Sequence, residues 1–484
     1  GYPFTLGVAS GDPAPDGAVL WTRLAPAPLS GGGMPRRRVP VDYEVALDER
    51  FRRPVQRGTT EARPELGHSV HVELEGLEPA REYFFRFRAA GELSPVGRTK
   101  TAPAADARPE ALAFAFVSCS QYEHGYYTAY RHVAEEDLDV VVHLGDYIYE
   151  YAPNIYTTPG GNVRLHSSRE ITTLDDYRNR HAQYKTDPDM QAAHARFPFI
   201  VTWDDHEIDN NWADEVPEDG QPADAFLRRR AAAFQAYFEH MPLRRTSRPR
   251  GIDLQLYRRI AYGDLATFNV LDTRQFRSDQ ACGDGRDVGC EERLDPARSI
   301  TGDAQERWLL DGLEDSRTRW NVLAQQVFFA QRDYEAGPLQ GFSMEAWDGY
   351  VASRDRILHG IAERRVDNPV VLTGDVHQHW AADLKADFDD PDSPTLGSEF
   401  VCTSITSGGD GSDEIPAPNQ VVLAESPHVK YNKNRRGYVR CQVDRTQWRT
   451  DFKVLPYVKR PGAPIATDRS FVIEAGRPGL QPVA

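Results

Sequence analysis

Residues 139–151, Asp-Val-Val-Val-His-Leu-Gly-Asp-Tyr-Ile-Tyr-Glu-Tyr, limit the possible folds of this chain more than any other stretch. The apolar run at 140–144, with polar sequence on both sides, is typical of a strand buried on both faces beneath helices. Such a strand delivers the residues after it to the carboxyl edge of its sheet, where open α/β sheets place their chemistry. Asp146 and Tyr149 are therefore a candidate metal site, although a helix N-cap aspartate beside surface tyrosines would explain this stretch alone about as well.

The pattern of short apolar strands continues from residue 111 onward. They alternate with longer amphipathic segments, such as 224–240 and 302–313, which we expect to be helices. This alternation predicts α/β organisation, with the last strands completing a second sheet packed on the first. The further strands are expected at 114–118, 199–203, 268–272, 320–324, 369–373, 400–406, 437–443 and 448–454.

Residues 1–103 have a different pattern. Short alternating segments at 17–23, 41–46, 68–74 and 83–88 are separated by turns rich in proline and glycine, which predicts a small all-β, immunoglobulin-like sandwich. Residues 104–110 interrupt both patterns and are expected to be a linker. The catalytic domain is then expected to occupy residues 111–484.

Charge and cysteine content narrow the function. The formal net charge of −16 argues against nucleic-acid binding, which needs a basic surface. No run of about 18 apolar residues could span a membrane, and the abrupt start without a signal peptide suggests a mature or trimmed form. Spacing favours disulfides between Cys282 and Cys290 and between Cys402 and Cys441, which would indicate a secreted protein. Cys119 would then remain unpaired, as a small buried residue or a ligand.

Chemically versatile residues follow the apolar strands at 117–120, 145–149, 203–212 and 373–380. A lone aspartate or histidine after a strand is more often a cap or turn residue. A shared sheet, however, would bring all these strand ends to one edge, and their convergence favours a binuclear metal site. The candidate residues are Cys119, Asp146, Tyr149, Asp205, His206, Asp375 and His377.

The chemistry of these side chains suggests which metals they would bind. A thiolate, a phenolate and an imidazole suit a transition ion, and a phenolate particularly favours Fe³⁺. The carboxylates of Asp205 and Asp375, with Asp146 as a bridge, are oxygen ligands that suit Ca²⁺. We therefore expect a mixed site with iron beside calcium.

The same segments resemble a known family. Gly145-Asp-Tyr-Ile-Tyr-Glu150, Trp203-Asp-Asp-His-Glu207 and Gly374-Asp-Val-His377 are similar to motifs of the calcineurin-like binuclear phosphoesterases, and more closely to those of the PhoD-type alkaline phosphatases. That family includes the iron-containing, calcium-dependent phospholipases D of streptomycetes. Segments 4–13 and 19–23 resemble its β-rich N-terminal domain. The resemblance covers nearly the whole chain and implies a two-sheet metallophosphoesterase sandwich flanked by helices, preceded by the immunoglobulin-like domain.

The resemblance also implies roles for individual residues. Cys119 and Tyr149 would bind iron together with His377, and Asp146 would bridge the two metals. Asp205 and Asp375 would give the second metal oxygen ligands, whereas the matching histidine, His206, contacts phosphate. The isolated histidine ligand of the wider superfamily is missing here, and Gln325, Gln326 or Asn211 is left open as its substitute.

These expectations lead to a secreted, metal-dependent phosphoester hydrolase in which a metal-bound hydroxide attacks phosphorus in line. Either Arg178 or Arg180 would hold phosphoryl oxygens, unless both belong to a solvated helix face. The substrate is expected to be a phosphate monoester, a diester or a phospholipid head group, with transient membrane-surface contact and no implied protein partner. The alternatives are a phospholipase D, a cell-surface binding protein with structural metals, and a serine hydrolase that uses Ser118 or Ser120. The sequence lacks the GxSxG segment that is usual in serine hydrolases.

Overall fold

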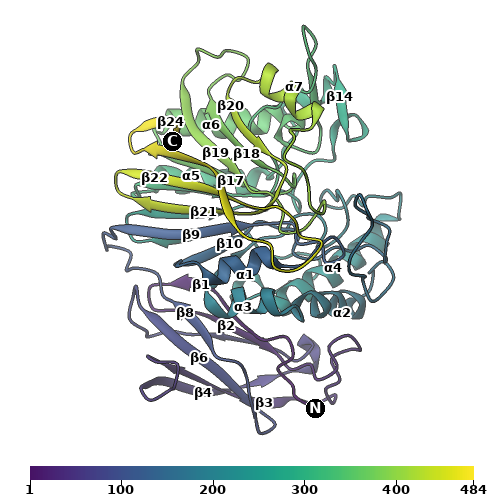
Figure 1. Ribbon diagram of the computed structural model, residues 1–484, viewed down its shortest axis with the longest axis vertical. Coiled ribbons are helices and arrows are strands. Elements are labelled where there is room, and N and C mark those ends of the chain that lie inside the picture. Colours follow the sequence, from purple (N-terminus) through teal and green to yellow (C-terminus); the bar gives the residue numbers. More distant parts are fainter. Residues whose placement is uncertain (484) are drawn as a thin grey trace.

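The computed structural model describes residues 1–483 and consists of stacked β-sheets with helices on their outer faces (Figure 1). Sheets of ten and seven strands pack on each other around a shared apolar core, which confirms the predicted two-sheet α/β sandwich. The strands expected at 437–443 and 448–454, however, do not complete a second sheet, because they extend the sheet that contains residues 111–117. In spatial order, the ten-stranded sheet contains β24 (Arg477–Val483), β23 (Ala466–Glu474), β22 (Gln447–Leu455), β21 (Arg436–Asp444), β9 (Ala111–Val117), β10 (Val140–His143), β11 (Pro198–Val201), β1 (Val8–Ala14), β2 (Gly17–Arg23) and β5 (Ser69–Glu73). The seven-stranded sheet contains β12 (Arg258–Tyr262), β13 (Ala266–Val270), β15 (Trp320–Ala324), β17 (Pro369–Thr373), β19 (Thr395–Val401), β18 (His379–Lys385) and β20 (Val429–Lys433).

The strands that lead to the candidate site are short and apolar. β9, β10 and β11 run parallel inside the ten-stranded sheet, and every residue of β10 and β11 is buried. Val142 faces the seven-stranded sheet, where it shares a core with Phe268 and Val370, whereas Val141 faces the helices. Burial on both faces explains why these strands carry almost no polar residues.

Helices cover the outer faces of both large sheets. Helices α1 to α4 form one apolar cluster with the ten-stranded sheet, and α5 and α6 form another with the seven-stranded sheet. None of the helices in residues 1–483 combines the length and the apolar character that a membrane crossing requires. The helices are α1 (Thr128–Glu135), α2 (Leu174–Lys185), α3 (Pro188–Arg196), α4 (Ala223–His240), α5 (Asp303–Asp315), α6 (Val351–Glu363) and α7 (Ala417–Glu425).

The N-terminal β-rich part shares a sheet with the rest of the protein. A five-stranded sheet lies at one end of the molecule (bottom of Figure 1) and packs on β1, β2 and β5. β1, however, pairs in parallel with β11, and a Cβ atom at Gly11 would lie 2.5 Å from the Phe199 carbonyl oxygen, so this approach requires glycine. The division into 1–103, 104–110 and 111–484 stays a prediction. The five-stranded sheet contains β4 (Pro54–Ala62), β3 (Val39–Ala46), β6 (Glu82–Ala89), β7 (Glu92–Leu93) and β8 (Gly97–Lys100).

One of the two expected disulfides is present. Cys282 and Cys290 are bonded, whereas the expected pairing of Cys402 with Cys441 is wrong and both thiols are free. Both lie in the core between the two large sheets, but the Cys402 thiol donates to Ser118 Oγ and Cys441 lies 3.7 Å from Thr450 Oγ1. The expected strand 400–406 also ends early, because β19 stops at residue 401.

Candidate metal centre

The strand ends described above meet at one place. Because β9, β10 and β11 are parallel neighbours, Cys119, Asp146 and Asp205 follow their carboxyl ends side by side. Strand β17 of the other large sheet contributes Asp375 and His377, whose ligand atoms lie close to those of Asp146. The strand ends therefore converge from two packed sheets and not from the single shared sheet that the sequence suggested. The group occupies the carboxyl edges of both sheets, which is a common position for a site in an α/β fold.

The backbone around this group adopts uncommon conformations. A positive φ is rare for residues other than glycine and costs roughly 1–3 kcal/mol. Such values nevertheless occur at Cys119 (59°), Asp146 (54°), Asn211 (50°), Asp375 (68°) and His377 (61°). Because such strain persists only where the surrounding structure imposes it, its concentration here indicates a functional site.

Cys119, Asp146, Tyr149 and His377 form a first donor group. The Cys119 thiol donates to Asp146 Oδ2 over 3.4 Å, and the Tyr149 hydroxyl lies 3.3 Å from the same oxygen. Tyr149 Oη is also 3.4 Å from His377 Nε2. Tyr149 is completely buried, which excludes the alternative that it is a surface tyrosine.

The first donor group has no positive charge of its own. Burial, and after it the Asp146 carboxylate, raises the pKa of both Cys119 and Tyr149 well above their usual values. Burial and the nearby Arg436 lower the pKa of His377 to about 3, so its imidazole is neutral and able to bind a metal. A thiolate and a phenolate would form here only beside a cation.

Asp146 also belongs to a second donor group, in which Asp146, Asp204, Asp205 and Asp375 offer oxygen atoms within 4.8 Å of one another. Burial and the neighbouring carboxylates raise the pKa of Asp146 and of Asp375 well above their usual range. Asp204 Oδ2 and Asp205 Oδ1 are buried without a hydrogen-bond partner among residues 1–483. Such a cluster of buried like charges requires a proton or a cation for stability.

Arg274 neutralises part of the second donor group. Its Nε donates to Asp204 Oδ1 over 2.7 Å, and the guanidinium also pairs with Glu345. Asp204 is therefore hydrogen-bonded to Arg274, whereas Asp205 Oδ1 forms only a longer ion pair with Arg274 Nη2, over 3.9 Å. Arg274 was not among the residues predicted from the sequence, although it follows β13 as the other site residues follow their strands.

His206 lies beside the two donor groups and is oriented by Glu150. The His206 Nδ1 atom is 2.7 Å from Glu150 Oε2, and its ring stacks on Tyr149 with centroids 4.3 Å apart. Burial alone would lower the pKa of His206, but the carboxylates of Asp205 and Glu150 raise it well above its usual value. Glu150 is buried next to Tyr149 in the sequence, yet its role was not predicted.

The structure does not bring Arg178 to this group. Its Nε and Nη2 atoms donate to the Glu239 carboxylate over 2.6 and 2.7 Å, so its guanidinium is engaged by a carboxylate and does not line the cavity over the donor groups. Arg180 donates to the carbonyl oxygens of Tyr149 and Tyr151 and thereby holds the loop after β10.

The three candidates for the missing superfamily histidine are separated by their contacts. The Gln325 amide donates to Thr373 and accepts from Trp347, and the Gln326 amide donates to Thr202 and accepts from Thr273. Both side chains are therefore committed to structural hydrogen bonds. Asn211 instead lines the cavity over the donor groups.

That cavity has a volume of about 370 Å³ and lies over the donor groups. It is lined by Asp146, Tyr151, Ile155, Tyr156, Asp205, His206, Asn210, Asn211, Asp375 and His377.

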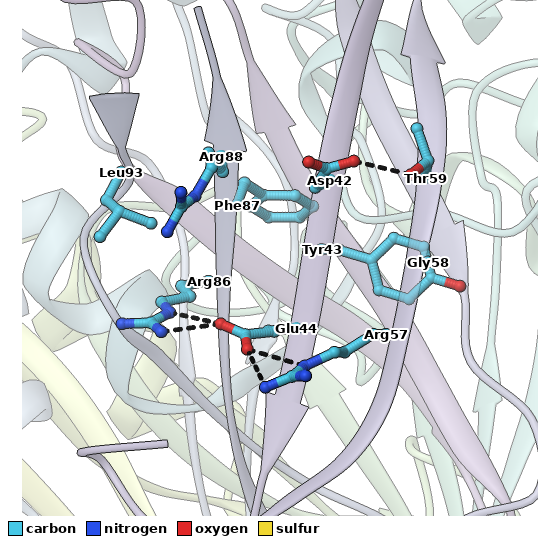
Figure 2. Close-up of a pocket in the computed structure, with 10 residues that line it drawn as sticks. All are labelled: Asp42, Tyr43, Glu44, Arg57, Gly58, Thr59, Arg86, Phe87, Arg88 and Leu93. Carbon is cyan, nitrogen blue, oxygen red and sulfur yellow. Dashed lines mark hydrogen bonds and ion pairs between the residues drawn. The ribbon is translucent and has the colours of Figure 1, made fainter. Parts of the chain in front are cut away.

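A separate hollow lies on the five-stranded sheet, where Glu44 pairs with both Arg57 and Arg86 and Asp42 accepts from Thr59 (Figure 2). Its acids are thus already engaged, so it offers no comparable metal site.

Comparison with known proteins agrees with this geometry. The family model described as PhoD-like phosphatase matches residues 114–452, and that of the PhoD-like phosphatase N-terminal domain matches residues 1–103. Alkaline phosphatase D of Bacillus subtilis (strain 168) is 56% identical over 483 residues, which are 100% of this chain and 83% of that protein. A solved structure of PhoD is 56% identical with a TM-score of 0.98, and the match covers 100% of this chain and 92% of that chain. The resemblance inferred from the motifs is confirmed, and the chain belongs to the PhoD-like phosphatase family of phosphoester hydrolases.

Proposed function

We propose that this phosphoester hydrolase holds Fe³⁺ beside Ca²⁺ at the two donor groups. The iron would be bound by Cys119, Tyr149 and His377, with Asp146 as the bridge to calcium. The observation that carries the proposal is the difference in chemistry between the groups, because sulfur, phenol and imidazole donors suit iron whereas carboxylate oxygens suit calcium.

The calcium would be bound by oxygen atoms of Asp205, Asp375 and Asn211 together with the shared Asp146. Asp205 Oδ1 has no hydrogen-bond partner among residues 1–483, although it lies 3.9 Å from Arg274 Nη2. This oxygen and the raised pKa of Asp375 support a cation at this position. Asn211 supplies a neutral oxygen, as amide ligands often do in calcium sites.

The two cations, when bound, would polarise phosphoryl oxygens and make a bound water more acidic. The protein contributes His206, which Glu150 holds through Nδ1, so that Nε2 remains available for the substrate. We propose that this nitrogen stabilises charge on a phosphoryl oxygen or protonates the leaving alkoxide. Tyr151 and Tyr156 form walls of the cavity and would limit how the ester can be oriented.

Metal analysis combined with visible spectroscopy tests this assignment. Purified protein should contain both iron and calcium and should be coloured by charge transfer from Tyr149 to Fe³⁺. Tyr149→Phe should abolish the visible band, whereas Tyr147→Phe should keep it, because the buried Tyr147 hydroxyl bonds to His194 and Lys185 outside the donor groups. A colourless protein that contains zinc would overturn the assignment.

A second candidate activity, phospholipase D, is favoured by apolar side chains on the loop at the cavity rim. Ile155 lines the cavity and is 68% exposed, and Leu165, which follows in the same loop but does not line the cavity, is 52% exposed. If this loop contacts a lipid surface, Ile155→Asp should lower head-group release from phosphatidylcholine vesicles by about tenfold. The same variant should hydrolyse a water-soluble monoester at the wild-type rate, and protein that acts only on the soluble ester would exclude a lipase.

We further propose that the protein is secreted. The supporting feature is the Cys282–Cys290 disulfide, because such bonds persist in oxidising compartments and are rare in the cytosol.

A further inference from the structure

Asn211 is held in place by three hydrogen bonds. Its backbone N–H donates to Asp205 Oδ2 over 2.9 Å, and its backbone carbonyl accepts from Gln280 Nε2 over 2.8 Å. Its side-chain Nδ2 donates to Asp284 Oδ2 over 2.8 Å. Within residues 1–483, no hydrogen bond involves Asn211 Oδ1, although the residue lines the cavity.

The hydrogen bond to Asp284 determines the orientation of the Asn211 side-chain amide, because its nitrogen faces Asp284 and its oxygen faces away. An asparagine amide has a donor end and an acceptor end, and an ionised carboxylate can only accept. If the amide were turned over, two oxygen atoms would face each other. Asp284 therefore keeps the oxygen of Asn211 as the atom that remains available to a cation in the cavity.

Asp284 lies in a short loop closed by the Cys282–Cys290 disulfide. Gly283, Gly285 and Gly289 in this loop have positive φ, as does Asp284 itself. Further support comes from the short pairing of β14 (Arg286–Val288) with β16 (Gly341–Ser343) and from a hydrogen bond that the Met344 N–H donates to the Gly285 carbonyl oxygen. A glycine-rich loop has many alternative conformations, which a covalent cross-link restricts.

We propose that Asp284 is a positioning residue for Asn211, and that the disulfide-closed loop thereby sets the calcium affinity of the site. This inference rests on the proposed calcium site and assigns to it a support outside the ligands themselves. Loss of a residue that orients a metal ligand typically weakens metal binding by about 10- to 100-fold. Reduction of the disulfide would weaken calcium binding through the same contact.

Calcium binding to iron-loaded, calcium-depleted protein, measured by titration calorimetry, tests the positioning role. Asp284→Ala should weaken calcium binding by about tenfold or more. Asp284→Asn should stay within about threefold of wild type, because its amide oxygen still accepts from Asn211. Asp287→Ala is the matched control, since Asp287 is in the same loop and has no side-chain hydrogen bond or ion pair among the described residues.

The alternatives give different results. If Asp284 acted only through its charge, the Asp284→Asn variant would bind calcium as weakly as the Asp284→Ala variant. Unchanged calcium binding by the Asp284→Ala variant would also overturn the proposal. If the wild type and the Asp284→Ala variant bind calcium equally well, only the positioning role of Asp284 is refuted, and the proposed calcium site stands. Absence of calcium binding by the wild type would refute the proposed cofactor as well.

A double replacement, Cys282→Ser with Cys290→Ser, tests the role of the loop. It should weaken calcium binding by about the same factor as Asp284→Ala, and adding Asp284→Ala should then change little, because the two changes act through one contact. Independent, multiplying losses would show that the disulfide does not act through Asp284.

Discussion

Asp146→Asn is expected to lower kcat/KM for a phosphoester by at least about a thousandfold, or about 4 kcal/mol of transition-state stabilisation. The substitution keeps the shape of the side chain but removes the charge that both donor groups share. Asp146 Oδ2 is within 3.4 Å of Cys119 Sγ and 3.3 Å of Tyr149 Oη, and Asp146 Oδ1 accepts from the backbone N–H of His206 over 3.3 Å. Loss of this charge should therefore deplete both metals, as measured by elemental analysis beside the kinetic assay.

Asp12→Asn is the matched control for Asp146→Asn. Asp12 is also buried, but it pairs with Arg258 away from the donor groups, so its replacement should leave activity unchanged. Metal-free Asp146→Asn should also melt at a higher temperature than metal-free wild type, because one member of a buried group of like charges is removed. Retention of both metals and of activity within about tenfold would contradict the shared-ligand role of Asp146.

Lys185→Met is expected to stabilise the protein at pH 8 by about 3 kcal/mol. Lys185 is 2% exposed, and no carboxylate of residues 1–483 forms an ion pair with it. Its Nζ donates to the Tyr147 hydroxyl and lies 4.5 Å from the centre of the Trp21 ring. Burial lowers the pKa of Lys185 from 10.5 to about 7, so folding at pH 8 must remove a proton from the ammonium group.

The gain from Lys185→Met should depend on pH in a defined way. Between pH 7 and 10.5 the unfolded lysine carries a proton that the folded one lacks, so the wild type gains stability as the pH rises through this range. The advantage of the variant should therefore be largest at or below pH 7 and should vanish near pH 10.5. Chemical denaturation at several pH values measures it, and Lys430→Met, at an exposed lysine, should show no such trend. A variant less stable than wild type at pH 7 would show that the aromatic contacts outweigh the burial of charge.

The candidate metal ligands that follow the buried strands could be predicted from the sequence, because their positions depend on local patterns. The apolar run before Asp146 specifies a buried strand, and the parallel order of β9, β10 and β11 then places the following residues together. Arg274 also follows a strand, β13, but its side chain is positively charged and is therefore not a metal ligand, so the pattern of ligand residues does not point to it. The role of Arg178, by contrast, depends on its partner Glu239, which lies 61 residues further along the chain on α4, the helix that packs against α2.

Other features depend on contacts that no local pattern reports. Cys402 and Cys441 lie in one apolar core, but their thiols contact hydroxyl groups and not each other. The alternating sequence pattern shows that two cysteines are in strands, but it does not show whether they form a disulfide. Choosing among Gln325, Gln326 and Asn211 likewise required their hydrogen-bond partners. The continuity of the N-terminal strands with the catalytic sheet was missed because the pairing of β1 with β11 joins residues far apart in the chain.

The pairing of β1 with β11 also bears on the order in which a nascent chain can fold. Ser10 pairs with Pro198, so the first strand cannot meet its parallel neighbour until the chain has been synthesised past β11. The C-terminal strands β21 to β24 then extend the other side of the same sheet, beyond β9. Non-local pairing of this kind slows folding and leaves strand edges exposed meanwhile. The enzyme therefore completes its largest sheet only after nearly all of its chain is available, and truncation from either end would expose strands that the intact protein covers.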